Sequence, residues 1–148
     1  MPKKYTFNVY PKGDGHTIYR VIEFPGNASL DKLCEAIMKA FDFIHEHMYE
    51  FCMDNRPYTD YNYQSHPDYP GQPSTKVKID QLGLAEKQTF SLHYDFGDDW
   101  MFTIKVMMIE DIDTAAVPKV MKAKGTLIQY PSWDDEEDAR HRRAAGRL

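Results

Sequence analysis

The sequence has few cysteines, no long apolar run and no signal-peptide pattern in its opening residues, and each absence argues against a class of protein. Its two cysteines, Cys34 and Cys52, match neither a zinc-ligand spacing nor a redox Cys-x-x-Cys pair. Two isolated thiols are typical of a reducing compartment, where we expect them to be buried. Because no apolar segment approaches membrane-spanning length and no signal peptide opens the chain, we expect a soluble, cytoplasmic protein.

An excess of positive charge is also missing. The chain of 148 residues has 18 Lys and Arg against 23 Asp and Glu, which gives a net charge of −5 and a pI near 5.6. Since binding to phosphates needs grouped cations, this balance does not favour a nucleic-acid binder. With 42% hydrophobic and 14% aromatic residues, the chain has enough apolar material for one domain with a real core.

The motifs of nucleophilic and phosphoryl-transfer enzymes are absent as well. Gly13-Asp14-Gly15 is too short to cradle a phosphate, and no Walker lysine follows it. Asp95-Phe96-Gly97 matches the kinase magnesium triplet, but the chain lacks the other kinase loops. Ser91 has no nucleophile elbow around it. These absences favour a protein that is not an enzyme.

Alternation of apolar and polar residues predicts five strands. They lie at residues 5–10, 17–24, 49–53, 90–96 and 100–108. The first two are separated by a turn cluster and predict an antiparallel hairpin, and the last two predict a second hairpin. A short extended piece is also expected around residues 77–79, whereas residues 118–125 are interpreted as a connection.

One helix is predicted over residues 30–41. Its apolar stripe consists of Leu30, Leu33, Cys34, Ile37 and Phe41. Ser29 can cap the helix, and Asp31 lies in the first turn, where the macrodipole favours an anion. The order of elements predicts an α+β fold: an antiparallel or mixed sheet of about five strands with one main helix packed across it and a β-grasp-like start.

We expect residues 1–131 to form a single domain and residues 132–148 to form a charged C-terminal tail. The tail has an acidic block at 134–138, followed by arginines. Residues 54–74 hold several prolines and tyrosines, which favour a loop that lies on the body of the domain.

The segment Tyr94 to Trp100 places three carboxylates and two aromatic residues around one glycine. Aspartates are ordinary turn residues, since their side chains bond nearby backbone N–H groups. Alternatively, Asp95, Asp98 and Asp99 together could bind a divalent cation. Phe96 and Trp100 are predicted to anchor the turn against the core.

Two histidines follow the predicted helix. His45 and His47 alternate on an extended segment, so both rings could reach one metal ion, with Asp98 of the turn completing the set. The alternative is a pair of surface histidines. His93 and Asp95 share one strand face by parity and could exchange a proton.

Several stretches together resemble the plasmid pRiA4b ORF-3-like family, also described as transposable-element passenger proteins. They are Thr17-Ile18-Tyr19-Arg20, Ser29-Leu30-Asp31-Lys32-Leu33, Ala40-Phe41-Asp42-Phe43, His47-Met48-Tyr49-Glu50-Phe51 and Tyr94-Asp95-Phe96-Gly97-Asp98-Asp99-Trp100. The resemblance implies an α+β domain whose biochemical role is not established. Longer members continue with a cysteine-containing segment that this chain lacks, so binding through that region is not expected here.

We therefore expect a non-catalytic binding or interaction module without a covalent cofactor, whose partner is an unknown protein or small molecule rather than a membrane. The candidate binding residues are Asp95, Asp98, Asp99, Trp100, Tyr58 and Tyr61. One alternative is a metal-assisted hydrolase that uses a divalent metal on His45, His47 and Asp98. Another is a nucleic-acid accessory factor, linked to mobile elements, that works through the arginines of the tail.

Overall fold

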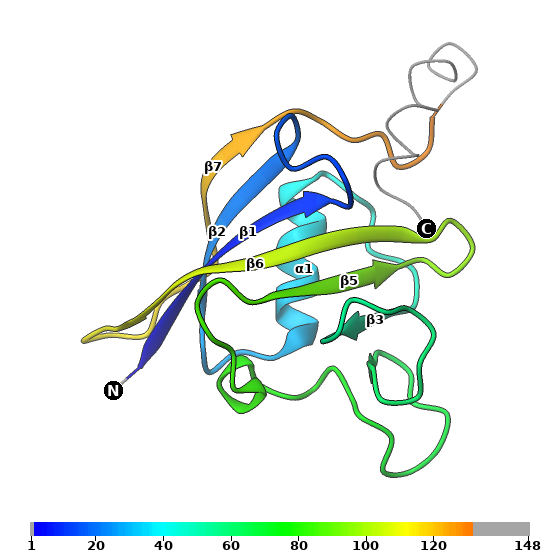
Figure 1. Ribbon diagram of the computed structural model, residues 1–148, viewed down its shortest axis with the longest axis horizontal. Coiled ribbons are helices and arrows are strands. Elements are labelled where there is room, and N and C mark those ends of the chain that lie inside the picture. The colour runs from blue at the N-terminus through cyan, green and yellow to red at the C-terminus, as the bar shows by residue number, and fades with distance from the viewer. Residues whose placement is uncertain (1, 132–148) are drawn as a thin grey trace.

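The computed structural model describes residues 2–131, which fold around one antiparallel sheet of seven strands in the order β4-β3-β5-β6-β1-β2-β7 (Figure 1). The strands are β1 (Lys3–Pro11), β2 (Tyr19–Pro25), β3 (Tyr49–Cys52), β4 (Tyr63–Gln64), β5 (Thr89–Tyr94), β6 (Trp100–Asp111) and β7 (Lys119–Lys124). The helices are α1 (Leu30–Ala40) and the short 3-10 helix η1 (Ile79–Leu82). Every pairing between named strands is antiparallel.

The predicted α+β fold, with about five strands, one main helix and a β-grasp-like start, was wrong. The described residues form mostly sheet, with seven strands and an α-helix of 11 residues. Strand β4 has two residues, and β7 is exposed along its whole length. Because alternation arises only where one face of a strand is buried, neither strand carries the pattern that predicts it. The piece expected at residues 77–79 instead leads into η1.

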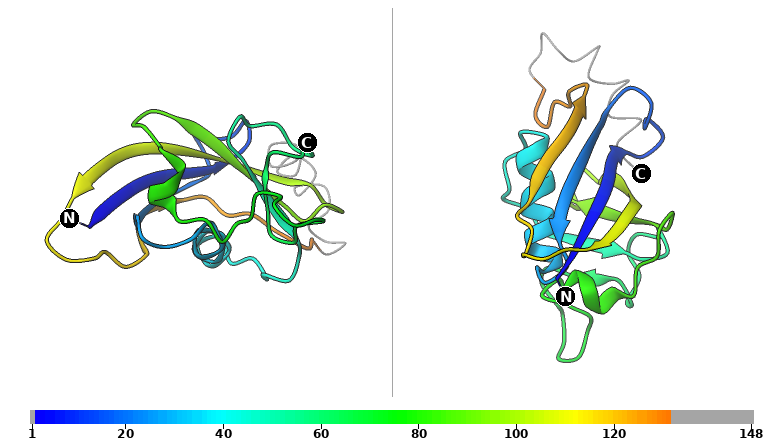
Figure 2. Two further views of the ribbon diagram at one scale, coloured as in Figure 1. Left: turned by 90° about the horizontal axis from the view of Figure 1, so that it is seen from below. Right: turned by 90° about the vertical axis from the view of Figure 1, so that its left-hand side faces the viewer.

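The strongly patterned elements were predicted correctly. Helix α1 begins after Ser29, whose side chain accepts a hydrogen bond from the Lys32 backbone N–H at 3.2 Å. The helix lies across one face of the sheet, as Figure 2 shows, and its apolar stripe packs into the core. Strands β1 and β2 pair as the predicted antiparallel hairpin. In the part of the chain that the structure describes, none of the helices has the length and apolar character that crossing a bilayer requires.

Arg20 interrupts the apolar face of β2 because it connects three elements. Its guanidinium lies 4.5 Å from the centre of the Phe41 ring and donates hydrogen bonds to backbone carbonyl oxygens. These acceptors are Ala40 O at 2.9 Å, Lys124 O at 2.8 Å and Gly125 O at 2.9 Å. A buried arginine thus holds the end of α1 against the end of β7.

The face of the sheet opposite α1 is polar where β3, β5 and β6 meet. In the strand register, Glu50 lies directly opposite His93, and His93 lies opposite Met101. Their neighbours along the strands, Phe51 and Leu92, point into the apolar core on the helix side. The following loop covers Glu50 and His93, which are both buried. The predicted tail, residues 132–148, lies outside the described residues.

Candidate functional site

The turn between β5 and β6 is built around Asp95. Asp95 and Asp99 have φ values of 65° and 54°, in the left-handed region that aspartate tolerates better than most residues. The Oδ1 atom of Asp95 accepts hydrogen bonds from the backbone N–H groups of Gly97 at 3.0 Å and Asp98 at 3.2 Å. The buried Asp95 therefore caps the turn from inside, and Asp98 and Asp99 lie further along it, half-buried.

Both aromatic residues anchor this turn, on opposite faces of the sheet. The buried Trp100 packs edge-on against Phe43 in the helix-side core, with 5.0 Å between ring centres. Phe96 packs on the other face against His93 at 4.9 Å and Tyr58 at 5.7 Å. The turn is thus fixed to the body of the protein, as its flanking aromatic residues predict.

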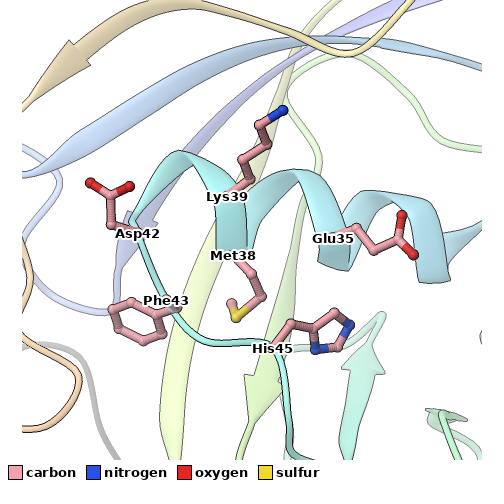
Figure 3. A pocket seen from close by; sticks show the side chains of 6 residues that line it. All are labelled: Glu35, Met38, Lys39, Asp42, Phe43 and His45. Atoms are coloured by element: carbon pink, nitrogen blue, oxygen red, sulfur yellow. The ribbon is translucent and has the colours of Figure 1, made fainter.

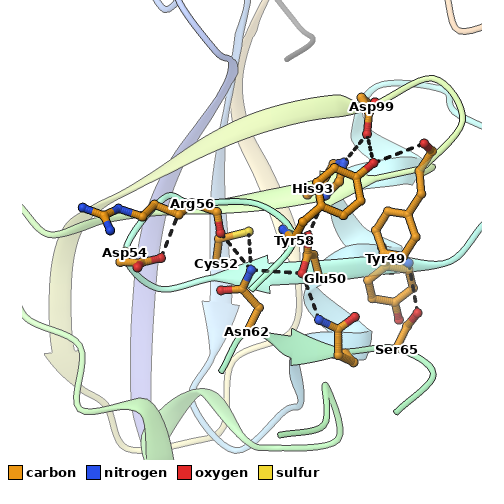
Figure 4. A network of polar contacts seen from close by, with 12 residues as sticks. Tyr49, Glu50, Cys52, Asp54, Arg56, Tyr58, Asn62, Ser65, His93 and Asp99 are labelled. Carbon is orange, nitrogen blue, oxygen red and sulfur yellow. Dashed lines mark hydrogen bonds and ion pairs between the residues drawn. The ribbon is translucent and has the colours of Figure 1, made fainter. Parts of the chain in front are cut away.

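A carboxylate–imidazole–carboxylate chain runs beneath the turn (Figure 4). His93 Nδ1 lies 2.7 Å from Glu50 Oε2, and His93 Nε2 lies 2.6 Å from Asp99 Oδ1. Both ring nitrogens of His93 thus lie within hydrogen-bond distance of a carboxylate oxygen. The predicted pairing of His93 with Asp95 does not form, because strand β5 ends at Tyr94, just before Asp95. The turn instead brings Asp99 to the imidazole ring of His93.

Glu50 has the most hydrogen-bond partners in this network. Its carboxylate also accepts hydrogen bonds from the Tyr58 backbone N–H at 2.7 Å, Asn62 Nδ2 at 3.0 Å and Gln64 Nε2 at 2.9 Å. Burial by itself raises the pKa of Glu50, but the hydrogen bonds from His93 and from these donors outweigh it, so the pKa is lowered. Glu50 therefore stays ionised and fixes the loop to the sheet.

Tyr58 lies between this network and solvent. Its hydroxyl donates to Asp99 Oδ1 and lies 3.3 Å from the carbonyl oxygen of Phe96. Its ring meets the His93 ring edge-on, at 4.7 Å between centres. Desolvation and the hydrogen bond to Asp99 raise the pKa of Tyr58 to about 12. Although Tyr58 is 58% exposed, its position is thus set by buried groups.

A small cavity of about 200 Å³ opens beside Tyr58. It is lined by Glu50, Tyr58, Thr59, Asp60, Gln64, Asp68, Gln72 and Phe96. Three of these residues are acidic and two are aromatic, so the cavity presents negative charge next to ring faces. Tyr61, which is 61% exposed, lies on the same loop.

His47 contacts the turn from the other side. Its Nε2 atom lies 3.4 Å from Asp95 Oδ2 and 2.6 Å from the hydroxyl of Tyr130, which in turn donates to Glu46 Oε1 at 2.8 Å. The buried hydroxyl of Tyr94 accepts the backbone N–H groups of Glu46 at 2.8 Å and His47 at 3.1 Å. The buried Tyr94 hydroxyl therefore holds the segment that carries His47 in place.

The two predicted metal-ligating histidines lie close in sequence but have different surroundings. His45 packs its ring against Tyr49 and Tyr94 and borders an open depression of about 430 Å³ under α1 (Figure 3). His47 faces Asp95 rather than Asp98. Within residues 2–131, no three or more His, Cys, Asp or Glu side chains form a group that could hold a metal ion. The set His45, His47 and Asp98 remains a prediction.

Both cysteines are buried and unpaired, as the sequence predicts. Burial, with nearby carboxylates adding to it, raises the pKa of the Cys34 and Cys52 thiols. A thiol held in its neutral form is a poor nucleophile, so neither side chain is a candidate for covalent catalysis.

Sequence reasoning missed the residues that hold the site together. Glu50, Asn62 and Gln64 come from β3, β4 and the loop between them, and Tyr130 lies near the C-terminal end of the described residues. One signal was available: Glu50 sits between Tyr49 and Phe51 in a strand whose other residues are apolar. An acid in such a strand needs buried donors.

Comparisons with known proteins give the family of the chain and a solved structure similar to it. The chain from residue 3 to residue 130 matches the family described as plasmid pRiA4b ORF-3-like protein. The chain is also similar to the crystal structure of a protein of unknown function from Methanosarcina mazei Go1. That likeness has a TM-score of 0.67 and 26% identity, and covers 83% of this chain and 70% of the other. No curated protein matches. The chain therefore belongs to the plasmid pRiA4b ORF-3-like family.

Proposed function

We propose that the chain is a non-catalytic binding module whose working surface lies at one end of its sheet. We call this surface the acidic end and define it by the turn at 95–99, the segment at 44–48 and the loop at 54–72. The observation that carries the proposal is their convergence: Tyr58 bonds to Asp99 on one side of the turn, and His47 contacts Asp95 on the other. Rigid, anchored side chains lower the entropic cost of binding a partner.

The charge of this end favours a cationic partner. The three segments that define it contain seven acidic residues, one arginine and no lysine. The acids are Glu46, Asp54, Asp60, Asp68, Asp95, Asp98 and Asp99. Because complementary potentials speed encounter and select partners, a basic segment of another protein is the partner that this end fits.

The aromatic residues of the loop add a second kind of attraction. Tyr58, Tyr61 and Tyr69 are exposed large side chains on one loop, and a ring face attracts an ammonium or guanidinium group. The cavity beside Tyr58 measures about 200 Å³, below the size of most small-molecule sites. It therefore suits a single lysine or arginine head group.

The buried network supports binding rather than reaction. Both nitrogens of His93 face carboxylates, and Glu50 accepts from several donors at once. Groups that satisfy one another in this way position Tyr58 and the loop. We place this function in the cytoplasm, in keeping with the two buried, unpaired cysteines.

Fluorescence anisotropy with a labelled lysine-rich peptide tests the proposal. Replacing Asp60 and Asp68 together by asparagine removes two charges at the cavity and should weaken binding about tenfold, with a strong dependence on salt. The matched control replaces Glu86 and Glu110, outside the acidic end, by glutamine and should change binding less than about twofold.

The outcomes are distinct. Equal binding by the two double variants, or no binding by the native chain, would contradict a cationic partner at this end. Stoichiometric metal in protein purified without chelator, lost in His47→Ala, would instead favour the hydrolase alternative.

A further inference from the structure

A groove runs between α1 and the edge strand β7, on a different part of the molecule from the acidic end. It has a volume of about 390 Å³, within the range typical of small-molecule sites. The lining residues are Ile22, Ala36, Lys39, Ala40, Pro118, Lys119 and Val120.

The groove is hollow because small residues face it. Ala36 and Ala40 lie one helical turn apart, so both are on the side of α1 toward the groove, and neither fills it. Ile22 of β2 and Val120 of β7 lie directly opposite each other in the strand pairing and contribute apolar walls. Val120 is 44% exposed, so apolar surface at this site remains open to water.

The charges at the groove have one sign. Lys39 in the last turn of α1 and Lys119 at the start of β7 both line it, and none of its seven lining residues is acidic. In Figure 3 the Lys39 side chain points to the opposite side of α1 from Met38. Apolar walls with cations suit a ligand that has an apolar body and an anionic head.

We propose that this groove binds a small amphipathic anion, of the class of medium-chain alkyl carboxylates. The apolar chain lies along Ile22, Ala36 and Val120, and the carboxylate meets Lys39 and Lys119. Burial of the chain provides most of the affinity, and the two lysines select the charged head.

Octanoate is the probe, with 1-octanol as the neutral counterpart of the same chain length. Titration calorimetry on the full chain should show octanoate binding, and octanol should bind about tenfold more weakly because it lacks the charge. Amide chemical shifts in α1 and β7 should move on addition of octanoate, while those of the 95–99 turn stay in place.

Two variants test the site in different ways. Ala36→Leu fills the groove with a good helix former and should abolish octanoate binding. Lys39→Gln with Lys119→Gln should weaken it about tenfold. Lys122→Gln is the matched control, since Lys122 lies on the same strand but not in the groove, and should bind as the native chain does.

Unchanged octanoate affinity in the double-lysine variant, or equal affinity for octanol, would overturn the proposal even if Ala36→Leu failed to fold. A second copy of the chain is the other possible occupant. In that case light scattering would show a dimer that Ala36→Leu disrupts and octanoate would not bind, which would also overturn it.

Discussion

The two ends of the sheet are held together in different ways. At the acidic end, the loop after β3 is fixed by side chains: a buried carboxylate, an imidazole and two amides. At the other end, β7 pairs with β2 through backbone groups, and all six of its side chains are exposed. The first arrangement depends on particular side chains, whereas backbone pairing in the second tolerates many different side chains. Substitutions should therefore have large effects at the acidic end and small ones along β7.

The largest effect is expected at Glu50. Its replacement by alanine leaves His93, Asn62, Gln64 and a backbone N–H without their buried acceptor. We expect Glu50→Ala to lower the free energy of unfolding by about 3–5 kcal/mol in urea titrations, the usual cost of breaking a buried charge pair.

The control for Glu50 is an exposed acid. Glu35 on α1 makes a surface ion pair with Lys32 at 3.3 Å. Glu35→Ala should cost less than about 0.5 kcal/mol. Similar losses for the two variants would mean that the buried network contributes nothing special.

Arg20 is the exception that sharpens the comparison, because it attaches the β7 end by a side chain. Arg20→Met removes the donor of three hydrogen bonds, to the carbonyl oxygens of Ala40, Lys124 and Gly125. We expect a loss of about 2–3 kcal/mol in urea titrations, since hydrogen bonds from a charged donor contribute more than neutral ones. Arg20→Lys keeps the charge but not the planar fork, and should recover less than half of the loss. Full recovery would show that charge alone matters.

Acid should affect the acidic end through Glu50. Its pKa is lowered from the ordinary value of 4.5, so the folded state binds a proton there less readily than the unfolded chain. The stabilisation is therefore present above about pH 4.5 and is lost as the pH falls below it. Urea titrations at several pH values should show a steeper acid loss for the native chain than for Glu50→Gln. Parallel curves would place the acid sensitivity elsewhere.

The sequence predicted those parts of the fold in which one face is buried and the other is not. The stripe of α1 with its Ser29 cap and the alternation along β5 and β6 are signals of this kind. The anchoring of the turn by Phe96 and Trp100 followed from the same reasoning, because aromatic residues beside a polar turn need a packing surface.

What escaped prediction depends on contacts between distant segments. The pairing of Glu50 with His93 requires the register of β3 against β5, which no local pattern reveals. The parity of His93 with Asp95 was sound along an ideal strand, but the φ of 65° at Asp95 ends that alternation. Strand β7 has no buried face at all, so its identity comes only from its neighbour β2.

The smallest effect on stability should come from the lysines of β7. Lys122→Thr with Lys124→Thr removes no buried group and should change the free energy of unfolding by less than about 0.5 kcal/mol for each site. Yet β7 is the last strand in the sheet order, and charged side chains discourage such an edge from pairing with another copy. Light scattering should therefore show concentration-dependent association of the double variant. A monomer as stable as the native chain at every concentration would mean that something other than lysine charge protects this edge.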